Sequence, residues 1–375
     1  MLLEKIHLDS AHPVTTKPLE MAVIIPTFNE AANVRPLLQR LALALAGIHW
    51  EAIFVDDNSP DGTAELVREI GRTNLHVRVV QRIGRRGLST AVVEGMLATS
   101  APVLAVIDGD MQHDERILRQ LYEAVSSGQS DIAVGTRYSS GGGVGDWASD
   151  RQRISRIATG LGQRILSVSV SDPMSGFFAL SRTTLMSALP RMSGVGFKVL
   201  LDILSSAPQP LRVAEVAYQF RSREAGESKL DAMVGLEYLM LLADKTVGRW
   251  VPVRLLSFLA VGGLGVVVHL AILGSALALG AEFMTAQTSA VLTAMTFNFF
   301  LNNIFTYRDR RLSGWRMVRG LLSFYAVCMV GGIANVGIGT YVNDLHSQWW
   351  LSGLAGVVIG AVWNFAASSV VTWRK

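Results

Sequence analysis

The last third of the chain has very few acidic side chains and consists mainly of long apolar stretches. Residues 251–375 contain eight Lys and Arg and three Asp and Glu, whereas residues 1–250 contain 26 basic and 27 acidic side chains. Four stretches in the last third are each close to the roughly 20 residues that a helix needs to cross a bilayer; they are Leu255–Leu279, Met284–Phe305, Leu321–Tyr341 and Trp349–Val371. We therefore predict a soluble part followed by a four-helix transmembrane domain at residues 251–375.

The positions of the basic side chains predict the orientation of these helices. They lie before the first stretch, between the second and third, and at the chain end: Arg249, Arg254, Arg308, Arg310, Arg311, Arg316, Arg319, Arg374 and Lys375. Because basic connections stay in the cytoplasm, both termini and the soluble part are expected there. Residues 1–20 lack an apolar core of signal-peptide length and are expected to form a flexible leader. The only cysteine, Cys328, excludes a disulfide or a cysteine-based metal site within one chain.

Short apolar runs alternate with helical periodicity between residues 21 and 126. Strands are expected at Met21–Pro26, Trp50–Val55, Val77–Val80 and Val103–Ile107, and helices at Asn33–Ala46, Ala64–Ile70, Ser89–Ala98 and Ile117–Val125, with Thr63 as the N-cap of the second helix. This alternation predicts an α/β fold with a mostly parallel sheet. No G-x-G-x-x-G follows the first strand, which argues against a dinucleotide-binding dehydrogenase. The glycine run at 141–145 is interpreted as a linker or a lid.

The strand Val103–Ile107 ends in a cluster of possible metal ligands. Asp108, Gly109 and Asp110 follow it directly, with Gln112 and His113 next. Ligands bind at the carboxyl ends of strands in open α/β sheets, and Mg²⁺ prefers one or two carboxylates together with substrate phosphate oxygens. The alternative is that Asp108 or Asp110 only caps the following helix.

Further acidic side chains follow the other expected strands, namely Glu30, Asp56 and Asp57. A nucleoside-diphosphate sugar requires such a pattern, with one carboxylate for the base or ribose and others for a metal on the diphosphate. The segment Asp57–Thr63 is also rich in turn formers, so a plain turn is the competing interpretation.

Several motifs together resemble those of GT-A glycosyltransferases of family 2, and among them the dolichol- or polyprenyl-phosphate mannose synthases. The matching segments span about residues 21–230: PTFNE (26–30), VDDNSPDGT (55–63), DGDMQH (108–113), DIAVGTRY (131–138), ISR (154–156), DPMSGFFAL (172–180), GFKVLLDIL (196–204) and GESKL (226–230). Phe28 replaces a common tyrosine of the family. Gly109 stands where mannose synthases usually have alanine and related glucosyl transferases often have glycine. The motif therefore does not decide which sugar is transferred.

The resemblance implies roles for individual residues. The metal, Mg²⁺ or Mn²⁺, is assigned to Asp108, Asp110 and Gln112. The nucleotide sugar is assigned to Pro26, Phe28, Glu30, Val55, Asp57 and Gly109, together with Asp108 and Asp110, and the diphosphate and acceptor phosphate to Arg137, Arg223 and Lys229. Among these, Asp110, Arg137 and Lys229 are the expected catalytic residues. Arg151 and Ser155 are further phosphate candidates, and Asp172–Phe178 is interpreted either as part of the site or as packing.

Two further segments concern the membrane. Residues 231–250 have the pattern of an amphipathic helix, which we place in the membrane interface, although packing on the sheet would give the same pattern. Residues 251–375 resemble the four-span GtrA-like domains found beside such transferases. We interpret this domain as an anchor and a possible interface between copies of the chain.

The resemblance implies inverting transfer of mannose from GDP-mannose to dolichyl or polyprenyl phosphate at the cytoplasmic membrane face. A hexosyl transferase that uses a UDP-sugar is the first alternative, and a non-catalytic membrane protein that binds or flips glycolipids is the second. A processive polysaccharide synthase is disfavoured because its QxxRW motif is absent.

Overall fold

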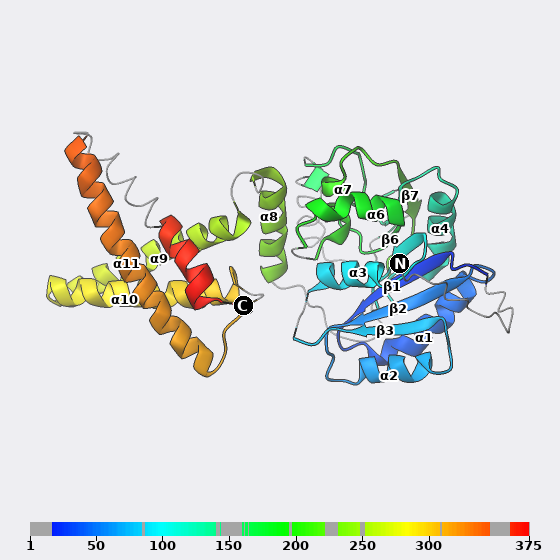
Figure 1. Cartoon of the computed structure of the whole chain (residues 1–375), viewed down its shortest axis with the longest axis horizontal. Coiled ribbons are helices and arrows are strands. Elements are labelled where there is room, and N and C mark those ends of the chain that lie inside the picture. The colour runs from blue at the N-terminus through cyan, green and yellow to red at the C-terminus, as the bar shows by residue number, and fades with distance from the viewer. Residues whose placement is uncertain are drawn as a thin grey trace, which may run out of the picture. The chain divides into compact units, whose positions relative to one another are not determined.

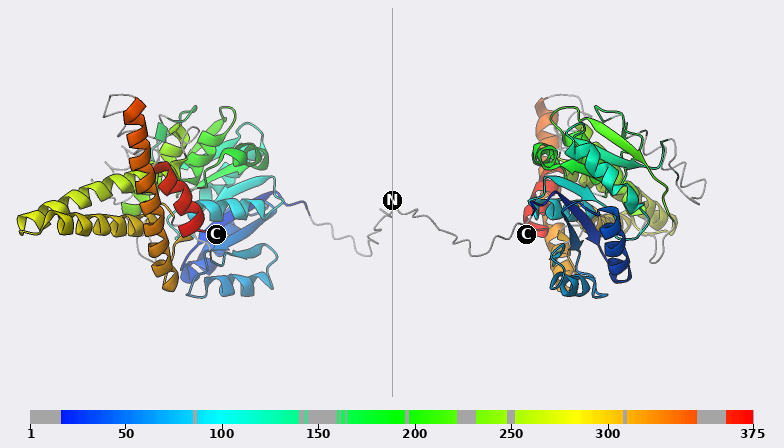
Figure 2. Two further views of the ribbon diagram at one scale, coloured as in Figure 1. Left: turned by 60° about the vertical axis from the view of Figure 1, so that its left-hand side comes forward. Right: turned by 90° about the vertical axis from the view of Figure 1, so that its right-hand side faces the viewer.

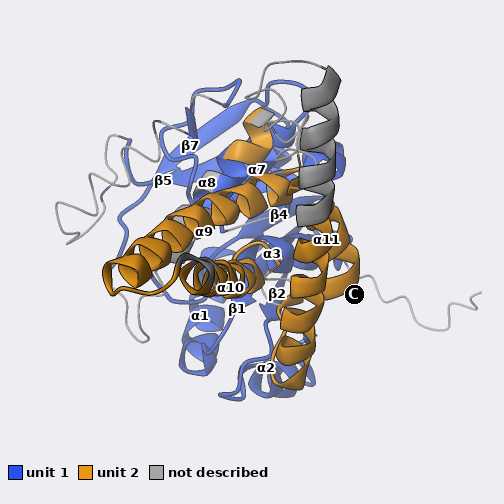
Figure 3. Ribbon diagram, turned by 90° about the vertical axis from the view of Figure 1, so that its left-hand side faces the viewer, with its two compact units in different colours: residues 1–242 blue, residues 243–375 orange. Residues whose placement is uncertain are grey.

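The structure, a computed structural model, divides into two compact units (Figure 3). It describes residues 17–84, 87–139, 143, 160, 162–163, 165–194, 197–221, 232–247, 252–307, 310–345 and 361–374. We call residues 1–242 the sheet unit and residues 243–375 the helical unit. The predicted division at 20, 230 and 250 stays a prediction.

A seven-stranded sheet forms the centre of the sheet unit, in the order β3-β2-β1-β4-β6-β5-β7 (Figure 1). The strands are β1 (Met21–Thr27), β2 (Trp50–Asp56), β3 (Val77–Gln81), β4 (Val103–Val106), β5 (Ile132–Thr136), β6 (Phe178–Ser181) and β7 (Val213–Ala217). Strand β6 runs antiparallel to its neighbours β4 and β5, whereas the other pairings are parallel. The predicted α/β fold with a mostly parallel sheet is therefore confirmed.

Helices cover both faces of this sheet, which explains why its strands are apolar on both sides. The sheet-unit helices are α1 (Ala31–Ala44), α2 (Thr63–Gly71), α3 (Leu88–Leu97), α4 (Leu118–Ser126), α6 (Arg182–Ala188) and α7 (Val199–Ser206), with short 3₁₀ turns η1 (Glu115–Ile117) and η2 (Leu189–Arg191). In β1, Met21, Val23 and Ile25 join the core beneath α1, α2 and α4. Ala22 and Ile24 join the core beneath α3, α6 and α7.

One predicted helix start is wrong. The residue that precedes α2 is Gly62, in the left-handed conformation with φ of 83°, so Thr63 is already helical and is not the N-cap. Its hydroxyl instead accepts a hydrogen bond from Glu30 N at 3.1 Å and donates one to Asp61 Oδ1 at 2.6 Å. Thr63 thereby ties the β2–α2 loop to the start of α1.

The helix α8 (Ala232–Val247) packs on the sheet unit. Tyr238 and Leu241 are buried in a cluster with Met174 and Leu201. The part of the apolar face of α8 that contains Tyr238 and Leu241 is therefore covered by protein. This agrees with the alternative interpretation, in which the helix packs on the sheet. The interfacial placement of residues 231–250 stays a prediction.

The helical unit contains α9 (Val253–Ala278), α10 (Phe283–Ile304) and α11 (Trp315–Leu345), a helical stretch at 361–367 and a π-helical turn, η4 (Ser368–Thr372). Helices α9 and α10 pack side by side (Figure 2). Among the described residues, one helix, Arg254–Ala278, is long and apolar enough to cross a membrane by length and composition. The first two predicted spans coincide with the helices α9 and α10, and the fourth lies partly outside the described residues. That α10 crosses a membrane stays a prediction.

The third predicted span lies within α11 but is shorter than this helix. We expected Arg316 and Arg319 in the connection that precedes the span, whereas α11 begins at Trp315 and includes both. Hydrogen bonding continues past the end of an apolar run when no breaker intervenes. The preceding Gly314, with φ of 55°, is the nearest break in the helical backbone.

Candidate active site

The end of β4 carries the two aspartates that the sequence predicts as metal ligands. The side chain of Asp108 is 37% exposed, and Asp110 is 9% exposed. Gly109 between them lies against the end of β1, because a Cβ there would be 3.2 Å from Thr27 Cγ2 and 3.6 Å from Glu30 Cγ. The absence of a side chain at 109 therefore lets the loops after β1 and β4 come together.

The helix that follows is capped by another aspartate. Its first turn, η1, begins at Glu115, and the N-cap Asp114 accepts a hydrogen bond from Arg116 N at 3.2 Å. Asp110 Oδ1 instead accepts from Gln112 N at 3.2 Å. The interpretation of Asp108 or Asp110 as the cap of this helix is therefore wrong.

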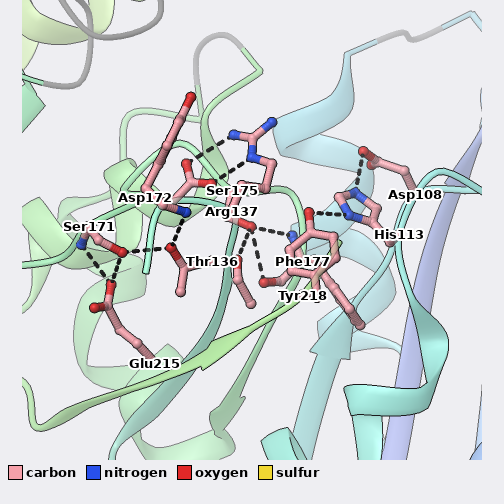
Figure 4. A network of polar contacts seen from close by, with 12 residues as sticks. Asp108, His113, Thr136, Arg137, Ser171, Asp172, Ser175, Phe177, Glu215 and Tyr218 are labelled. Atoms are coloured by element: carbon pink, nitrogen blue, oxygen red, sulfur yellow. Dashed lines mark hydrogen bonds and ion pairs between the residues drawn. The ribbon is translucent and has the colours of Figure 1, made fainter. Parts of the chain in front are cut away.

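Asp108 is hydrogen-bonded to a buried histidine, which is in turn hydrogen-bonded to a buried tyrosine (Figure 4). His113 Nε2 lies 3.1 Å from Asp108 Oδ2, and His113 Nδ1 lies 2.7 Å from the Tyr218 hydroxyl. His113 and Tyr218 are only 4% and 3% exposed. The rings of Phe177 and Phe220 pack against the imidazole, with centroids 5.1 and 5.5 Å away. Burial raises the pKa of Tyr218, so its hydroxyl stays protonated.

Gly176 leaves the space that Asp108 occupies. A Cβ at position 176 would lie 2.9 Å from Asp108 Oδ2, closer than side-chain atoms normally approach. The neighbouring Ser175 hydroxyl donates to Gly135 O at 2.7 Å and fixes this turn to β5. The motif Asp172–Phe178 thus contributes both packing, through buried Phe177 and Phe178, and space for the carboxylate.

Gln112 joins the site to the segment after β7. Its Nε2 donates to Arg221 O at 3.2 Å, and its own carbonyl accepts from Arg221 N at 2.9 Å. Because the amide nitrogen faces Arg221, the Oε1 atom is the one suited to a cation. Arg221 also binds Asp114 and Glu115, at 2.8 and 2.9 Å, and so fixes the loop after the aspartates.

Arg137 forms a buried ion pair. Its Nε and Nη2 donate to the two carboxylate oxygens of Asp172 at 2.7 and 3.0 Å, and Asp172 is fully buried. Burial by itself would lower the pKa of Arg137, but the hydrogen bonds and charge of Asp172 outweigh it and raise the pKa. A phosphate bound by Arg137 would therefore share the guanidinium with Asp172.

After β2, Asp57 is held by a buried arginine. Arg82 is 1% exposed, and its Nη1 donates to Asp57 Oδ1 at 2.7 Å. The other carboxylate oxygen accepts from Gly87 N at 2.8 Å. The same guanidinium donates to Gly87 O at 3.0 Å and Thr90 Oγ1 at 2.5 Å. Arg82 thus connects the end of β2 to the start of α3.

The segment after β2 is a closed turn, as its composition predicts. Asp56 is fully buried and accepts hydrogen bonds from Ser59 N and Ser59 Oγ. The Ser59 hydroxyl also accepts from Asn29 N at 2.9 Å, and Asp61 accepts from Ala31 N at 3.0 Å. This turn therefore supports the β1–α1 loop, where Phe28 and Glu30 lie. Glu30 Oε2 accepts from Asn33 Nδ2 at 2.7 Å.

Pro26 and Val55 are paired across β1 and β2 and are both buried. Any ligand contact at these two positions would have to come through the backbone. Arg223 and Lys229 lie outside the described residues, as do Arg151 and Ser155.

Sequence reasoning missed several residues of this arrangement, namely Arg82, Arg221 and Tyr218, and it singled out Asp172 only as part of a motif, without its partner Arg137. Tyr218 and Arg221 come from the segment after β7, more than a hundred residues beyond the motif that they contact. Arg82 carried a usable signal, because it follows a strand directly and precedes the glycine at 87.

The chemistry of the donor set fits a hard divalent cation. Two carboxylates and one amide oxygen are ligands that Mg²⁺ accepts, with the remaining positions taken by substrate phosphates and water. Among the described residues, no cluster of three or more His, Cys, Asp or Glu side chains forms a self-contained metal site. A cation here would therefore be completed by the substrate.

Comparison with known proteins agrees with this architecture. The model of glycosyl transferase family 2 matches residues 22–187, and the model of the GtrA/DPMS transmembrane domain matches residues 257–373. An α/β glycosyltransferase domain followed by a membrane domain is thus the class that the chain represents.

Relatives that match over longer stretches narrow this class. A dolichol-phosphate mannosyltransferase from Pyrococcus furiosus is 33% identical over 95% of this chain and 99% of its own length. One from Saccharomyces cerevisiae is 35% identical over 64% of this chain and 92% of its own length. A solved glucosyl-3-phosphoglycerate synthase from Mycobacterium tuberculosis has a TM-score of 0.45 and 19% identity over 60% of this chain and 79% of its own, which is too distant to carry over its ligands. The chain belongs to glycosyl transferase family 2, in the group of the dolichol-phosphate mannosyltransferases.

Proposed function

We propose that the protein transfers mannose from GDP-mannose to dolichyl or polyprenyl phosphate, with inversion, at the cytoplasmic face of a membrane. The observation that carries this proposal is the match to a dolichol-phosphate mannosyltransferase over almost the whole of both chains. The position of Asp108 and Asp110 after β4, beside the loop after β1, supports it.

In this reaction an oxygen of the acceptor phosphate attacks the anomeric carbon, and the bond from that carbon to the diphosphate breaks. The second pKa of a phosphate monoester is about 6, so the acceptor is mostly a dianion at neutral pH. It needs no side-chain base, in contrast to an alcohol acceptor. The protein has to position the two substrates and to stabilise the negative charge on the departing diphosphate.

The residues divide into roles on this basis. Asp108, Asp110 and Gln112 would hold Mg²⁺ or Mn²⁺, which neutralises charge on the diphosphate when bound. Phe28, Glu30 and Asp57 are assigned to the nucleotide, with Asp57 fixed by Arg82. Arg137, Arg223 and Lys229 are assigned to the diphosphate and the acceptor phosphate.

The proposal is tested with purified full-length protein, radiolabelled GDP-mannose, UDP-glucose and other nucleotide sugars, and a polyprenyl phosphate, each with and without a chelator. Chelator-sensitive transfer from GDP-mannose is expected. Transfer from a UDP-sugar alone would support the hexosyl alternative, and no transfer from any donor would favour a glycolipid-binding protein.

The matched variants are Asp110→Asn and Glu123→Gln. Each replaces one carboxylate by an amide, and Glu123 lies on the exposed face of α4, 61% exposed. Asp110→Asn is expected to reduce transfer at least 100-fold, and Glu123→Gln to leave it unchanged. Equal activity of the two variants would contradict the metal assignment.

A further inference from the structure

Two segments of the helical unit have nearly the same sequence. LLSFLAV at residues 255–261, in α9, reappears as LLSFYAV at residues 321–327, in α11. Six of the seven positions are identical, at an offset of 66 residues (from 255 to 321). Gly265 and Gly331 continue the match at the same offset.

The same offset relates α10 to the last helix of the chain. FNFFLNNIFTYR at 297–308 aligns with WNFAASSVVTWR at 363–374, so that Asn, Phe, Thr and Arg coincide and Tyr307 matches Trp373. The repeat therefore covers both helices of a hairpin. An offset shared by two consecutive helices indicates an internal repeat of one structural unit, as found in many membrane proteins.

The hydrogen bonds of the helical unit repeat with the sequence. Ser257 Oγ lies 3.0 Å from Thr306 Oγ1, and the equivalent Ser323 Oγ lies 3.0 Å from Thr372 Oγ1. A Cβ on Gly265 would lie 2.2 Å from Asn298 Oδ1, and a Cβ on Gly331 would lie 2.0 Å from Asn364 Oδ1. Each hairpin thus has the same hydroxyl pair and the same asparagine packed on a glycine.

The contacts between the two hairpins are reciprocal. Phe258 of the first contacts Phe365 of the second, and their counterparts Phe324 and Phe299 also pack together, both pairs with ring centroids 5.8 Å apart. In an interface between identical surfaces, residue i contacts j and j contacts i, which is the signature of a two-fold axis.

The residues expected on such an axis contact their own counterparts. The rings of Tyr307 and Trp373 are stacked, with centroids 4.1 Å apart and planes 5° from parallel. The Tyr307 hydroxyl lies 2.7 Å from Ser369 Oγ, and Trp373 Nε1 donates to Asn303 Oδ1 at 3.1 Å. Ser369 and Asn303 are themselves counterparts at the same offset.

We infer that the helical unit consists of two copies of one helical hairpin, residues 255–308 and 321–374, which associate through the same surface about an approximate two-fold axis. Each hairpin therefore has the other hairpin of the same chain as its partner. Each copy has two antiparallel helices, so the chain returns to its starting side before the second copy begins. The first helices of the two copies therefore run in the same direction, as in parallel repeats related by an axis along the membrane normal.

The test exchanges the two residues on the axis in the full-length chain. The double variant Tyr307→Trp/Trp373→Tyr keeps one tyrosine and one tryptophan in the stack and places a donor opposite both Ser369 and Asn303. Tyr307→Ala and Trp373→Ala remove half of the stack and are each expected to lower the melting temperature in detergent by on the order of 10 °C. The double exchange is expected to lower it by less than half as much.

Trp315→Tyr is the matched control, because Trp315 is 67% exposed, and no shift is expected there. A double exchange that loses as much as the alanine variants, or that aggregates, would overturn the inference, since the two positions would not be equivalent. Alanine variants that unfold at the parent temperature would overturn it as well, because the stack would then not hold the hairpins together.

Discussion

The carboxylate of Asp108 is held by two buried side chains. His113 contacts Asp108, and the Tyr218 hydroxyl contacts the far nitrogen of His113. In metal sites, partners of this kind orient the ligand, and their removal typically costs 10- to 100-fold in metal affinity; the proposed metal role of Asp108 therefore predicts a loss when they are changed.

Tyr218→Phe removes only the hydroxyl and keeps the aromatic packing around His113. We expect the affinity for Mn²⁺, measured from the electron paramagnetic resonance signal of the free ion, to fall at least about 10-fold, while the melting temperature changes little. Tyr122→Phe, on α4, is the control and should bind Mn²⁺ as the parent does. Unchanged Mn²⁺ affinity in Tyr218→Phe would show that the hydroxyl does not act through Asp108.

The second prediction concerns the buried pair Arg82 and Asp57. Removing one partner of such a pair leaves an uncompensated charge and costs about 3 to 5 kcal/mol. Arg82→Met should lower the free energy of unfolding by that amount in urea titrations, and adding Asp57→Asn should restore part of it. Arg212→Met breaks a pair whose arginine is 61% exposed, and its cost should stay below about 1 kcal/mol. Equal losses in the two arginine variants would contradict the role of burial.

At this scale the sequence locates the candidate ligands better than the residues that contact them. The position of Asp108 and Asp110 after a strand of the sheet could be predicted because an apolar run ends directly before them. Tyr218 could not, since it reaches His113 from a segment 105 residues further along the chain. Asp172 lies in a motif that the sequence singles out, but nothing near it indicates its contact with Arg137.

Among the elements, η1 joins the active-site loop to the segment after β7 through one carboxylate. Asp114 caps η1 and binds both Arg116 and Arg221. Burial raises the pKa of Asp114, but the hydrogen bonds of Arg116 and the charge of Arg221 outweigh it, so the pKa lies below its ordinary value of 3.8.

A carboxylate whose pKa is depressed in the folded state stabilises the protein at pH values above the pKa that it has in the unfolded state. That contribution is lost as the pH falls through the lower, folded value. The free energy of unfolding of the parent should therefore exceed that of Asp114→Asn by a constant amount from pH 7 to 5, and the gap should narrow below pH 4. Urea titrations at several pH values measure it. A gap that stays constant down to pH 3 would show that the ion pairs are not its source.

The strands and helices up to residue 126 were predictable because each has its own periodicity and its own stop signal. β5, β6 and β7 were not among the expected strands, and β7 is only partly buried. Their places in the sheet are set by pairing with β4 and β5, which are distant in sequence. The antiparallel β6 carries the Gly176 turn to Asp108, so this unpredicted strand completes the site.

For the whole molecule, the charge asymmetry of the chain predicts two parts, and the structure divides at residue 242. The hydropathy of the last part predicts spans but not the internal repeat, because an apolar pattern is similar in any membrane helix. The repeat becomes evident when the same offset relates both sequence and contacts.

The repeat predicts that its two equivalent glycines, Gly265 and Gly331, are equally sensitive to substitution. In a membrane bundle, small residues let helices approach closely, and at Gly265 and Gly331 that space is filled by Asn298 and Asn364. Gly265→Ala and Gly331→Ala should therefore each lower the melting temperature in detergent, by similar amounts, as overpacking costs about 1 to 3 kcal/mol. Gly262→Ala on the same helix as Gly265 meets no atom within 4 Å, and should be neutral or slightly stabilising because alanine favours helix over glycine by about 1 kcal/mol. A loss at only one of the two glycines would mean that the hairpins share their sequence but not their packing.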